Sequence, residues 1–363
     1  MKVKKAILTG GGRATRLHPI TTTINKHLLP LANKPMIFHA IEKAVEAGIT
    51  DIFINTNPGE TELQKYIGDG GHWGVTITYF EQIGGPQGIA HVVNVAKDFI
   101  GDDPFMFYLS DNILLGSIKD MVAEFNQGEH DCMLALSEVK DPQRFGVPIF
   151  DEHKRLVDVH EKPAEPQNNF AVTGIYLYGP RVFFDTFKHI KKSDRGEYEI
   201  SSIHSHFLQH NKKVGYKEIT GWWKDTGKMN DLLIANTLLL ENMSEDEFSI
   251  DGEVEEGVAI SGNVHIGSGS RVGKNTTIKG PVIIGENCVL DDCTIGPNVT
   301  LGAGSDVAYA TIENSVLLNN ITIRVPKKIT QSIIGKNAQI IPRVDTRCDG
   351  HAMIIGDKTI IEM

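Results

Sequence analysis

A run of glycines and a group of basic side chains lie close together at the start of this sequence. The glycines are Gly10, Gly11 and Gly12, and the cations that follow include Arg16 and Lys26. Seven Lys or Arg residues precede Glu42, the first acidic residue, although the formal net charge of the chain is −10. Glycines let a ligand approach the main chain closely, and clustered cations attract anions. The segment therefore predicts a pocket for a polyanion such as a nucleoside triphosphate.

Two aspartates further along the chain are candidate metal ligands. Asp111 follows an apolar run at 105–110, and Asp225 lies in the run Trp-Trp-Lys-Asp-Thr-Gly at 222–227. Magnesium typically takes one or two protein carboxylates and completes its coordination with phosphate oxygens and water. Taken alone, each aspartate is more often a turn or cap residue. On the residues alone, the metal site is a hypothesis.

These side chains need a scaffold, and the first two thirds of the sequence predict an α/β sheet. Apolar runs at 6–8, 52–55, 76–80 and 105–110 predict strands, and helical patterns occur at 34–47, 60–67, 88–98 and 228–243. The first of these helices would begin at Pro35. This alternation is typical of a Rossmann-like, mostly parallel sheet. Ligands of such sheets lie beyond the carboxyl ends of the strands, where the glycine run and Asp111 would both fall.

The last third of the sequence has a different texture. After an acidic connector at 244–257, an aliphatic residue recurs about every six positions. The repeating positions are Ile260, Ile266, Val272, Ile278, Ile284, Leu290, Ile295, Leu301 and Val307, and a looser period continues through Ile334 and Ile340. This period indicates a hexapeptide-repeat, left-handed parallel β-helix of roughly five coils over 250–345. The predicted domains are 1–243 for the α/β part and 244–363 for the β-helix.

Composition narrows the class of protein. The 363 residues are 40% hydrophobic and 23% charged, enough for two domains with their own cores. We expect neither a signal peptide nor a membrane span, since no apolar run reaches roughly eighteen residues. The four cysteines lack zinc or Cys-x-x-Cys spacing and are expected to be reduced thiols in a cytoplasmic protein. The net negative charge argues against a nucleic-acid partner.

The glycine-rich segment resembles the signature of sugar-nucleotide pyrophosphorylases. It reads Gly-Gly-Arg-Ala-Thr-Arg-Leu-His-Pro at 11–19, Asn-Lys-His-Leu-Leu-Pro at 25–30 and Asn-Lys-Pro-Met at 33–36, with Ala14 where the family usually has glycine. The resemblance covers the whole chain and is closest to the long form of the glucose-1-phosphate thymidylyltransferases. That form carries a β-helix tail and ends much as this chain does at 355–358. The resemblance implies transfer of a nucleotidyl group from dTTP to glucose 1-phosphate with Mg²⁺, releasing pyrophosphate.

The resemblance also implies roles for individual residues. The catalytic residues would be Arg16, Lys26 and Lys162, and the metal ligands Asp111 and Asp225. The nucleotide would contact Leu8, Gly10, Gly11, Gly12, Thr15, Arg16, Gln82, Gly88 and Asp111. The sugar phosphate would contact Gly146, Glu161, Lys162, Val172, Thr173 and Gly174. These residues lie in runs similar to family motifs: Arg-Phe-Gly-Val at 144–147, Glu-Lys-Pro at 161–163 and Ala-Val-Thr-Gly at 171–174.

Three details depart from the family pattern or lack a residue-level role. Ser110 stands where the family usually has a glycine before the aspartate, and one extra residue separates Gln82 from Gly88. Gln82 would still pair with the imide edge of thymine or uracil. The run Arg-Gly-Glu-Tyr-Glu-Ile at 195–200 matches a further motif, which we expect to support the site.

Three functions remain open on the sequence alone. The first is a thymidylyltransferase acting on glucose 1-phosphate. The second is a UTP-dependent uridylyltransferase, or a bifunctional enzyme whose β-helix transfers acetyl groups with His265 or His351 as a base. The third is a non-catalytic regulatory subunit, although such a subunit would be expected to have lost Arg16, Lys26, Asp111 or Asp225. We expect the β-helix to serve assembly and stability without chemistry of its own, in a homo-oligomer such as a trimer or tetramer.

Overall fold

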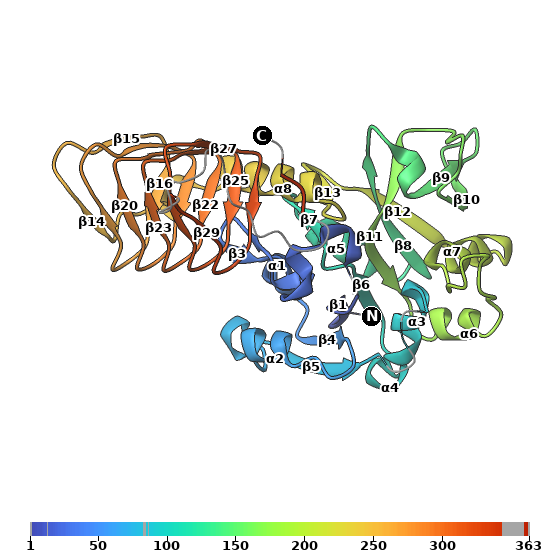
Figure 1. Cartoon of the computed structure of the whole chain (residues 1–363). Helices are drawn as coiled ribbons and strands as arrows, with labels where there is room; N and C mark the ends of the chain where they lie inside the picture. Colours follow the sequence, from blue (N-terminus) through green and yellow to red (C-terminus); the bar gives the residue numbers. More distant parts are fainter. Residues whose placement is uncertain (1, 13, 83–84, 86, 343–358, 362–363) are drawn as a thin grey trace. The chain divides into compact units, whose positions relative to one another are not determined.

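The computed structural model describes residues 2–12, 14–82, 85, 87–342 and 359–361. By spatial contacts the chain divides into two compact units (Figure 1). Unit 1 comprises Met1–Gly12 and Ile37–Asp225, and unit 2 comprises Arg13–Met36 and Thr226–Met363. The segment after the glycine run therefore groups with the C-terminal part of the chain, although 189 residues separate it from Thr226.

Unit 1 is built on a mixed sheet, which has nine strands in the part of the chain that the structure describes. The strands are β1 (Lys5–Thr9), β4 (Asp51–Thr56), β5 (Thr76–Glu81), β6 (Phe105–Tyr108), β8 (Cys132–Glu138), β9 (Gly146–Phe150), β10 (Leu156–Glu161), β11 (Phe170–Tyr178) and β12 (Val214–Glu218). Their order is β10-β9-β11-β6-β1-β4-β5, and β8 lies between β11 and β12. β1 runs parallel to β4 and β6, whereas β11 is antiparallel to β6, β8 and β9.

Helices and a small second sheet complete unit 1. The helical elements are α1 (Met36–Glu46), α2 (Glu62–Ile67), η4 (Gly71–Trp73), α3 (Ile89–Val95), α4 (Lys97–Ile100), α5 (Lys119–Phe125), η5 (Pro142–Arg144), α6 (Val182–Phe187) and α7 (Ile200–Gln209). The small sheet pairs β7 (Asn112–Leu114) with β13 (Trp223–Asp225). Residues of α3, α6 and α7 pack with strand residues such as Ile7, Phe107 and Tyr176 in one buried cluster. This core fixes the strands whose ends carry the predicted site.

Three predicted elements of the α/β part have other limits in the structure. The first helix begins at Met36, because Lys34 and Pro35 form the short strand β3 (Lys34–Pro35) and pair with β2 (Pro30–Leu31). A tight turn at Ala32 and Asn33, with φ of 47° and 60°, closes this hairpin. A proline at a helix start and a proline in a short edge strand look alike in sequence.

The other two differences also follow from local turns. The predicted strand 105–110 ends at Tyr108, because the chain turns after Leu109, whose carbonyl accepts the Asn112 N–H. The predicted helix 88–98 is two helices, α3 and α4, which meet at Ala96. Neither difference moves Asp111 from the carboxyl end of β6.

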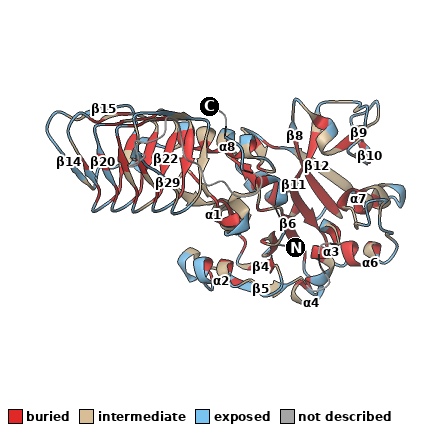
Figure 2. Ribbon diagram, in the orientation of Figure 1, coloured by how far each residue is buried: buried red, intermediate tan, exposed pale blue. Residues whose placement is uncertain are grey.

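Unit 2 contains a stack of coils whose short strands form three parallel sheets. The strands are β14 (Glu253–Val254), β15 (Ala259–Ser261), β16 (Val264–Ile266), β17 (Arg271–Val272), β18 (Thr277–Lys279), β19 (Val282–Ile284), β20 (Val289–Asp291), β21 (Thr294–Ile295), β22 (Val299–Leu301), β23 (Asp306–Ala308), β24 (Thr311–Glu313), β25 (Ser315–Leu317), β26 (Thr322–Arg324), β27 (Lys328–Thr330), β28 (Ile333–Ile334) and β29 (Gln339–Ile340). The repeating aliphatic residues stack in register, for example Ile266 on Ile284 and Ile284 on Leu301. The predicted fold class is confirmed, and Figure 2 shows the buried strands of the stack.

Residues 14–36 and the helix α8 (Met229–Asn242) also belong to unit 2. The segment contains η1 (Thr15–Leu17), η2 (Ile20–Thr22), η3 (Lys26–Leu28) and the hairpin of β2 and β3. After α8, Ser244 begins the short turn η6 (Glu245–Glu247) with a capping box closed by Glu247. The acidic connector is therefore ordered where it leaves α8.

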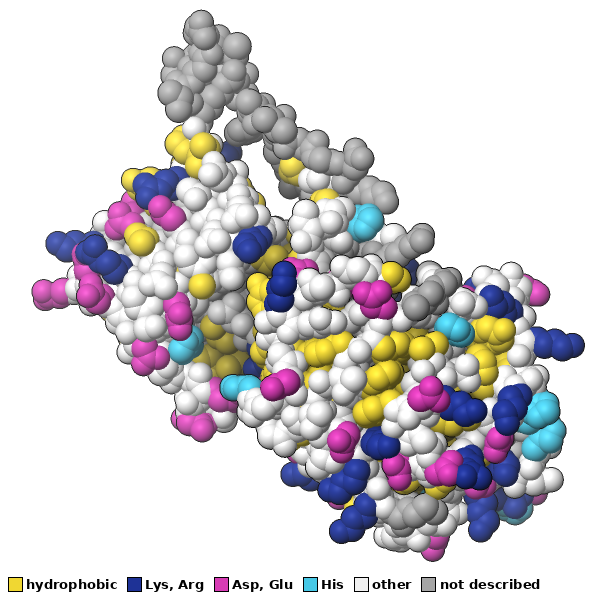
Figure 3. All heavy atoms as spheres, turned by 90° about the horizontal axis from the view of Figure 1, so that it is seen from below, with side chains coloured by type: hydrophobic (Ala, Val, Ile, Leu, Met, Phe, Trp, Pro, Cys, Tyr) yellow, Lys and Arg dark blue, Asp and Glu magenta, His cyan; other side chains and the backbone are white. Residues whose placement is uncertain are grey.

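Charged side chains of both signs are interspersed on the face shown in Figure 3. None of the helices among the described residues combines the length and the apolar character of a membrane-crossing segment. Cys132, Cys288 and Cys293 are buried free thiols. Cys348 lies outside the described residues.

Candidate active site

The carboxyl ends of β1 and β6 meet at one edge of the sheet in unit 1. These strands are parallel neighbours, and Leu8 pairs with Tyr108 near their ends. The Ser110 N–H donates to Thr9 Oγ1 at 2.8 Å, which joins the two chain segments just beyond the strands. The glycine run and Asp111 therefore leave the sheet side by side, as parallel pairing requires. Leu8 itself is buried within β1.

The pairing of β7 with β13 brings the two candidate metal ligands to the same place. Asp225 lies opposite Asn112 in this antiparallel pair, next to Asp111 in the chain. The Asn112 amide donates to Asp111 Oδ1 at 2.9 Å, and Arg144 Nη2 lies 4.0 Å from Asp225 Oδ2. Two carboxylates at an open strand end match the oxygen-only, one- or two-carboxylate donor set of a magnesium site that also uses substrate phosphate. Among the described residues no group of three or more acidic, His or Cys side chains forms a closed metal cage.

The negative charge at this edge affects the pKa values of two buried tyrosines, Tyr108 and Tyr176. Burial raises the pKa of the Tyr108 hydroxyl, and the Asp111 carboxylate raises it further. The Tyr108 hydroxyl donates to Asn112 O at 2.9 Å. Burial also raises the pKa of Tyr176, with further contributions from the negative charges of Glu161 and Asp111. Tyr176 is therefore within electrostatic reach of both a predicted metal ligand and a predicted sugar ligand.

Two asparagines at the end of β4 hold the glycine run, and the sequence did not single them out. The Gly10 N–H donates to Asn55 Oδ1 at 3.1 Å, and the Gly12 N–H donates to Asn57 Oδ1 at 2.9 Å. Asn55 is 2% exposed, and its amide also lies 3.4 Å from Gln82 Oε1. One side chain thus links the glycine run to the predicted base-pairing residue. Their place at the end of an apolar run is visible in the sequence, but the backbone N–H groups that they accept are not.

The segment that contains Gln87 and Gly88, predicted to lie beside the base and called the base loop below, packs tightly against the Arg-Gly-Glu-Tyr-Glu-Ile run at 195–200. Gly88 has φ of +97°, and a Cβ added there would lie 2.5 Å from Tyr198 O. The Tyr198 N–H donates to Gln87 O at 2.8 Å, and the Ala90 N–H donates to Tyr198 O at 3.2 Å. Only glycine fits this position, for reasons of both conformation and space. The run at 195–200 therefore supports the base loop directly.

The predicted sugar-phosphate residues gather on β9, β10 and β11. Gly146 pairs with Glu161 on one side and with Val172 on the other. A Cβ on Gly146 would lie 3.7 Å from Glu161 Oε2, so a side chain at this position would contact the carboxylate. Lys162 Nζ donates to Glu161 Oε1 at 2.6 Å, and the Lys162 backbone has φ of 44°.

Arg195 ties this group to the base loop. Its Nη2 lies 3.5 Å from Glu161 Oε1 and 2.8 Å from Glu199 Oε1. Thr173 and Gly174 lie deeper on β11. The Thr173 hydroxyl donates to Ala135 O at 2.9 Å, and a Cβ on Gly174 would lie 2.7 Å from the Leu109 side chain. Thr173 and Gly174 thus pack against β8 and the turn before Asp111.

Thr15, Arg16 and Lys26 lie in unit 2. Thr15 and Arg16 are exposed side chains of η1, and Lys26 begins η3. The N-terminal cap of η1 is Ala14, which has the left-handed conformation, with φ of 44° and ψ of 37°. A glycine would adopt this conformation more readily, which is a physical reason for the glycine usual at this place.

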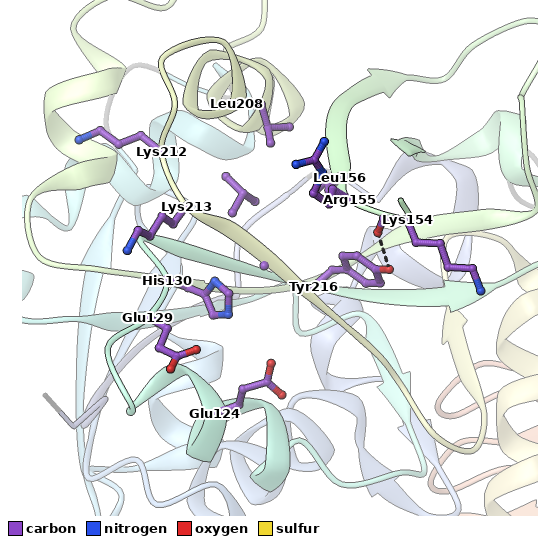
Figure 4. A pocket seen from close by; sticks show the side chains of 12 residues that line it. Glu124, Glu129, His130, Lys154, Arg155, Leu156, Leu208, Lys212, Lys213 and Tyr216 are labelled. Atoms are coloured by element: carbon purple, nitrogen blue, oxygen red, sulfur yellow. Dashed lines mark hydrogen bonds between the residues drawn. The ribbon is translucent and has the colours of Figure 1, made fainter. Parts of the chain in front are cut away.

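Two concave regions of unit 1 differ in their relation to the predicted residues. A pocket of about 460 Å³ between β10 and α7 is bordered by Glu161 and by polar residues such as Ser201 and His206. A pocket of about 710 Å³ at the end of β12 is lined by basic side chains such as Lys213, and His130 packs over Gly215 there (Figure 4). None of the predicted site residues lines this second pocket.

Comparison with known proteins agrees with the motifs. The model of the nucleotidyl transferase family matches residues 5–242, and that of the GMPPB C-terminal domain matches residues 278–362. A glucose-1-phosphate thymidylyltransferase of Streptomyces antibioticus is 36% identical over 360 residues, covering 99% of both chains. A low-salt glycan biosynthesis nucleotidyltransferase of Haloferax volcanii is 37% identical over 361 residues, covering 99% of this chain and 100% of that protein.

A solved structure also resembles the chain. It is of a Bacillus anthracis protein reported as a candidate glucose-1-phosphate thymidylyltransferase. It has a TM-score of 0.62 and 38% identity, and the match covers 66% of this chain and 96% of that one. The resemblance predicted from the motifs is confirmed, and the chain belongs to the nucleotidyl transferase family.

Proposed function

We propose that this protein transfers a thymidylyl group from dTTP to glucose 1-phosphate, giving dTDP-glucose and pyrophosphate. The observation that carries the proposal is the match along 99% of both chains to a relative named for this activity. The paired ends of β7 and β13, with Asp111 and Asp225, support it. A nucleoside triphosphate and a sugar 1-phosphate are the substrates that the family implies.

In this reaction the protein contributes mainly by positioning the substrates and stabilising charge, and little by covalent chemistry. An oxygen of the sugar phosphate attacks the α-phosphorus of the triphosphate, a new P–O bond forms, and the bond to the β-phosphate breaks as pyrophosphate leaves. The attacking phosphate is already ionised at neutral pH, since its second pKa is about 6, and no general base is needed. The protein must hold two repelling anions in line and stabilise the charge on the leaving group.

Lysine and arginine side chains supply the positive charge in this proposal. Arg16 and Lys26 bind the triphosphate and the departing pyrophosphate, and Lys162 binds the phosphate of the sugar. Gly10, Gly11 and Gly12 offer backbone N–H groups, and Thr15 follows them at the start of η1. The hydrogen bonds from Gly10 and Gly12 to Asn55 and Asn57 support a fixed glycine run.

In the same proposal the base binds beyond β5 and the sugar binds at β9, β10 and β11, which lie on opposite sides of β1 and β6 in the sheet. Gln82 pairs with the imide edge of thymine, and Gly88 leaves room for the base. Glu161 accepts hydrogen bonds from sugar hydroxyls, and Gly146 lets the ring lie on bare backbone. Val172, Thr173 and Gly174 form the strand beneath the sugar. The pairing of Gly146 with both Glu161 and Val172 supports this placement.

Asp111 and Asp225 would hold Mg²⁺ together with substrate phosphate and water. A bound magnesium ion supplies charge stabilisation to the α-phosphate and the leaving group. Asn112 orients Asp111 by its hydrogen bond, and Arg144 lies beside Asp225. These contacts keep both carboxylates in place before substrate binds.

The β-helix serves stability and assembly in this proposal, and the functional domains divide at 243–244. The protein would form a homo-oligomer, a trimer or tetramer, which light scattering of the full chain tests. The acetyltransferase alternative has less support. His265 Nδ1 lies 3.1 Å from Ser249 Oγ, an ordinary surface contact, and His351 lies outside the described residues.

A substrate matrix tests the activity. Pyrophosphate release is measured for dTTP and UTP, each with glucose 1-phosphate, glucosamine 1-phosphate or N-acetylglucosamine 1-phosphate, with and without a chelator. The expected result is highest kcat/KM for dTTP with glucose 1-phosphate and no release in the chelator. Preference for UTP or for an amino sugar would replace the proposed substrates. No release with any pair would support the regulatory alternative.

A further inference from the structure

One face of the β-helix differs from the other two in being covered. The middle residues of β19, β22 and β25 are Ile283, Thr300 and Val316, and they are 5%, 0% and 0% exposed. Neighbours along these strands belong to the interior cluster of the coils, namely Val282, Ile284, Val299, Leu301 and Leu317, so these three side chains point outward. The corresponding strand β20 on another face has Val289 at 45% exposure. A surface that points outward and is buried must be covered by another element.

The helix α8 is an element that contacts this face. α8 packs against both β25 and β2. Asn236 lies in the middle of α8 and is 1% exposed. Its Oδ1 accepts the Ala32 N–H at 2.9 Å and lies 3.4 Å from the Thr300 hydroxyl. One buried amide therefore joins the hairpin of β2 and β3 to a strand of the β-helix.

The hairpin continues directly from the segment that carries the phosphate-binding cations. Lys26 begins η3, the Leu29 N–H donates to Lys26 O at 3.1 Å, and Pro30 begins β2. Leu28, Leu29 and Leu31 are 5%, 1% and 0% exposed, so the chain from Lys26 to the hairpin is anchored by burial. Only three residues separate Lys26 from Pro30, so a displacement of the hairpin would be transmitted to Lys26.

A second contact joins the same segment to the last coils. A Cβ on Gly335, which follows β28, would lie 3.5 Å from Ile20 Cδ1. Ile20 begins η2, between Arg16 and Lys26. The segment therefore contacts the β-helix at Gly335 and is joined to it through α8 at Asn236.

We infer that Asn236 is a positioning residue for nucleotide binding, and that the β-helix is the platform on which it acts. Thr300 and Asn236 fix the hairpin tip through the Ala32 N–H, and the hairpin in turn fixes Lys26. The β-helix therefore contributes to affinity for the triphosphate as well as to stability. This inference rests on the proposed role of Lys26 in triphosphate binding.

The test uses the full chain with Asn236→Leu, which removes the acceptor but keeps similar volume, and with the milder Thr300→Val. Hydrogen exchange of the peptide containing residues 28–36 is followed with KM for each substrate. Loss of one buried hydrogen bond is expected to speed exchange of the Ala32 amide by about tenfold in Asn236→Leu. KM for dTTP rises by about five- to tenfold, while KM for glucose 1-phosphate changes by less than about twofold.

Two controls separate positioning from general damage. Thr300→Ser keeps the hydroxyl and should restore both exchange and KM to the wild-type values. Thr276→Val alters a buried threonine elsewhere in the β-helix, 1% exposed, and should leave the 28–36 peptide unchanged. Unchanged exchange in both Asn236→Leu and Thr300→Val, or an equal rise of both KM values, would overturn the inference. If the wild-type chain turns over neither substrate, the proposed function fails, and the exchange data still decide whether Asn236 holds the hairpin.

Discussion

The β-helix and the α/β sheet obtain their order from contacts of very different sequence separation. In the β-helix, Ile284 stacks on Leu301, the residue one coil later. At the edge of the sheet, Asn55 reaches back to Gly10, and Asp225 pairs with Asn112 from the other half of the unit. The fold of a repeat region is visible in the sequence as a short period. A site assembled from distant segments is represented in the sequence only by scattered residues. Mutations should therefore act differently in the two regions.

The largest effect is expected at the edge of the sheet, where Asp111→Asn and Asp225→Asn should each abolish most turnover. Each change keeps the size of the side chain but removes a carboxylate charge from the proposed magnesium site, and a bound metal contributes several kcal/mol to transition-state stabilisation. We expect kcat to fall by about a hundredfold or more at saturating magnesium. Steady-state pyrophosphate release over a magnesium titration measures this.

Asp103→Asn is the matched control for that pair. Asp103 lies before the amino end of β6, the opposite end from Asp111, and pairs with Lys5 at 2.8 Å on the surface. Its substitution should change kcat by less than about twofold, because exposed ion pairs contribute little. Retention of more than about a tenth of the wild-type kcat by Asp111→Asn or Asp225→Asn would remove that residue from the metal site.

The next largest effect is on stability, in the interior of the β-helix. Leu290 is 0% exposed and stacks in register between Val272 and Val307. Leu290→Ala should lower the free energy of unfolding by about 2–5 kcal/mol, since it leaves a cavity in the coil. Val289→Ala changes the adjacent residue, which is 45% exposed, and should cost less than about 1 kcal/mol. Urea unfolding measures both, and equal losses would contradict the inward and outward alternation.

Much of the fold could be predicted from the sequence, for reasons that differ between the two regions. The six-residue period identified the coils because each repeat places an aliphatic residue at the same inward position. In the sheet, apolar runs marked the strands, but the strand ended at Tyr108 because the chain turns at Leu109, whose carbonyl accepts the Asn112 N–H. Pro35 was misplaced because its partner Pro30 was not visible as a strand.

Candidate site residues could be proposed from the sequence only where they belong to a recognisable run. The motifs gave the candidates, and the structure then assembled Gly146, Glu161 and Val172 by register. Asn55 and Asn236 escaped because a lone asparagine in a strand or helix carries no local signal of its partner. Their function depends on which distant backbone N–H they accept. Tertiary packing determines which backbone N–H group each asparagine accepts.

A smaller effect should distinguish Lys26 from Lys162, the two lysines proposed to bind anions. Removing a charge-assisted hydrogen bond costs about 1.5–3 kcal/mol, or roughly 10- to 150-fold in KM. Lys162→Ala should raise KM for glucose 1-phosphate by such a factor, and Lys26→Ala should raise KM for dTTP. Initial rates with one substrate varied and the other saturating measure the split. Equal changes for both substrates in both variants would refute it.

Lys154→Ala is the matched control for Lys162→Ala. Lys154 is exposed in the turn between β9 and β10 and has φ of 59°, close to the 44° of Lys162. Both substitutions place alanine in the same left-handed region, so the backbone cost is shared. A change in KM for Lys162→Ala without one for Lys154→Ala assigns the effect to the lysine charge beside Glu161 and not to backbone strain.

The smallest effect is expected at Ala14, where glycine should be better than alanine. Ala14 has the left-handed conformation, and its carbonyl accepts the Leu17 N–H and the Thr21 hydroxyl, each at 2.9 Å. A Cβ in this conformation destabilises the folded state by about 1–2 kcal/mol. Glycine removes that cost, but its greater freedom in the unfolded chain offsets part of the gain in stability. Ala14→Gly should therefore raise the free energy of unfolding by about 0.5–1 kcal/mol.

Ala123→Gly makes the same change at an exposed position inside α5, where it should lower stability by about 1 kcal/mol. Urea unfolding of the two variants should give opposite signs, and destabilisation by both would show that the turn at Ala14 is not strained.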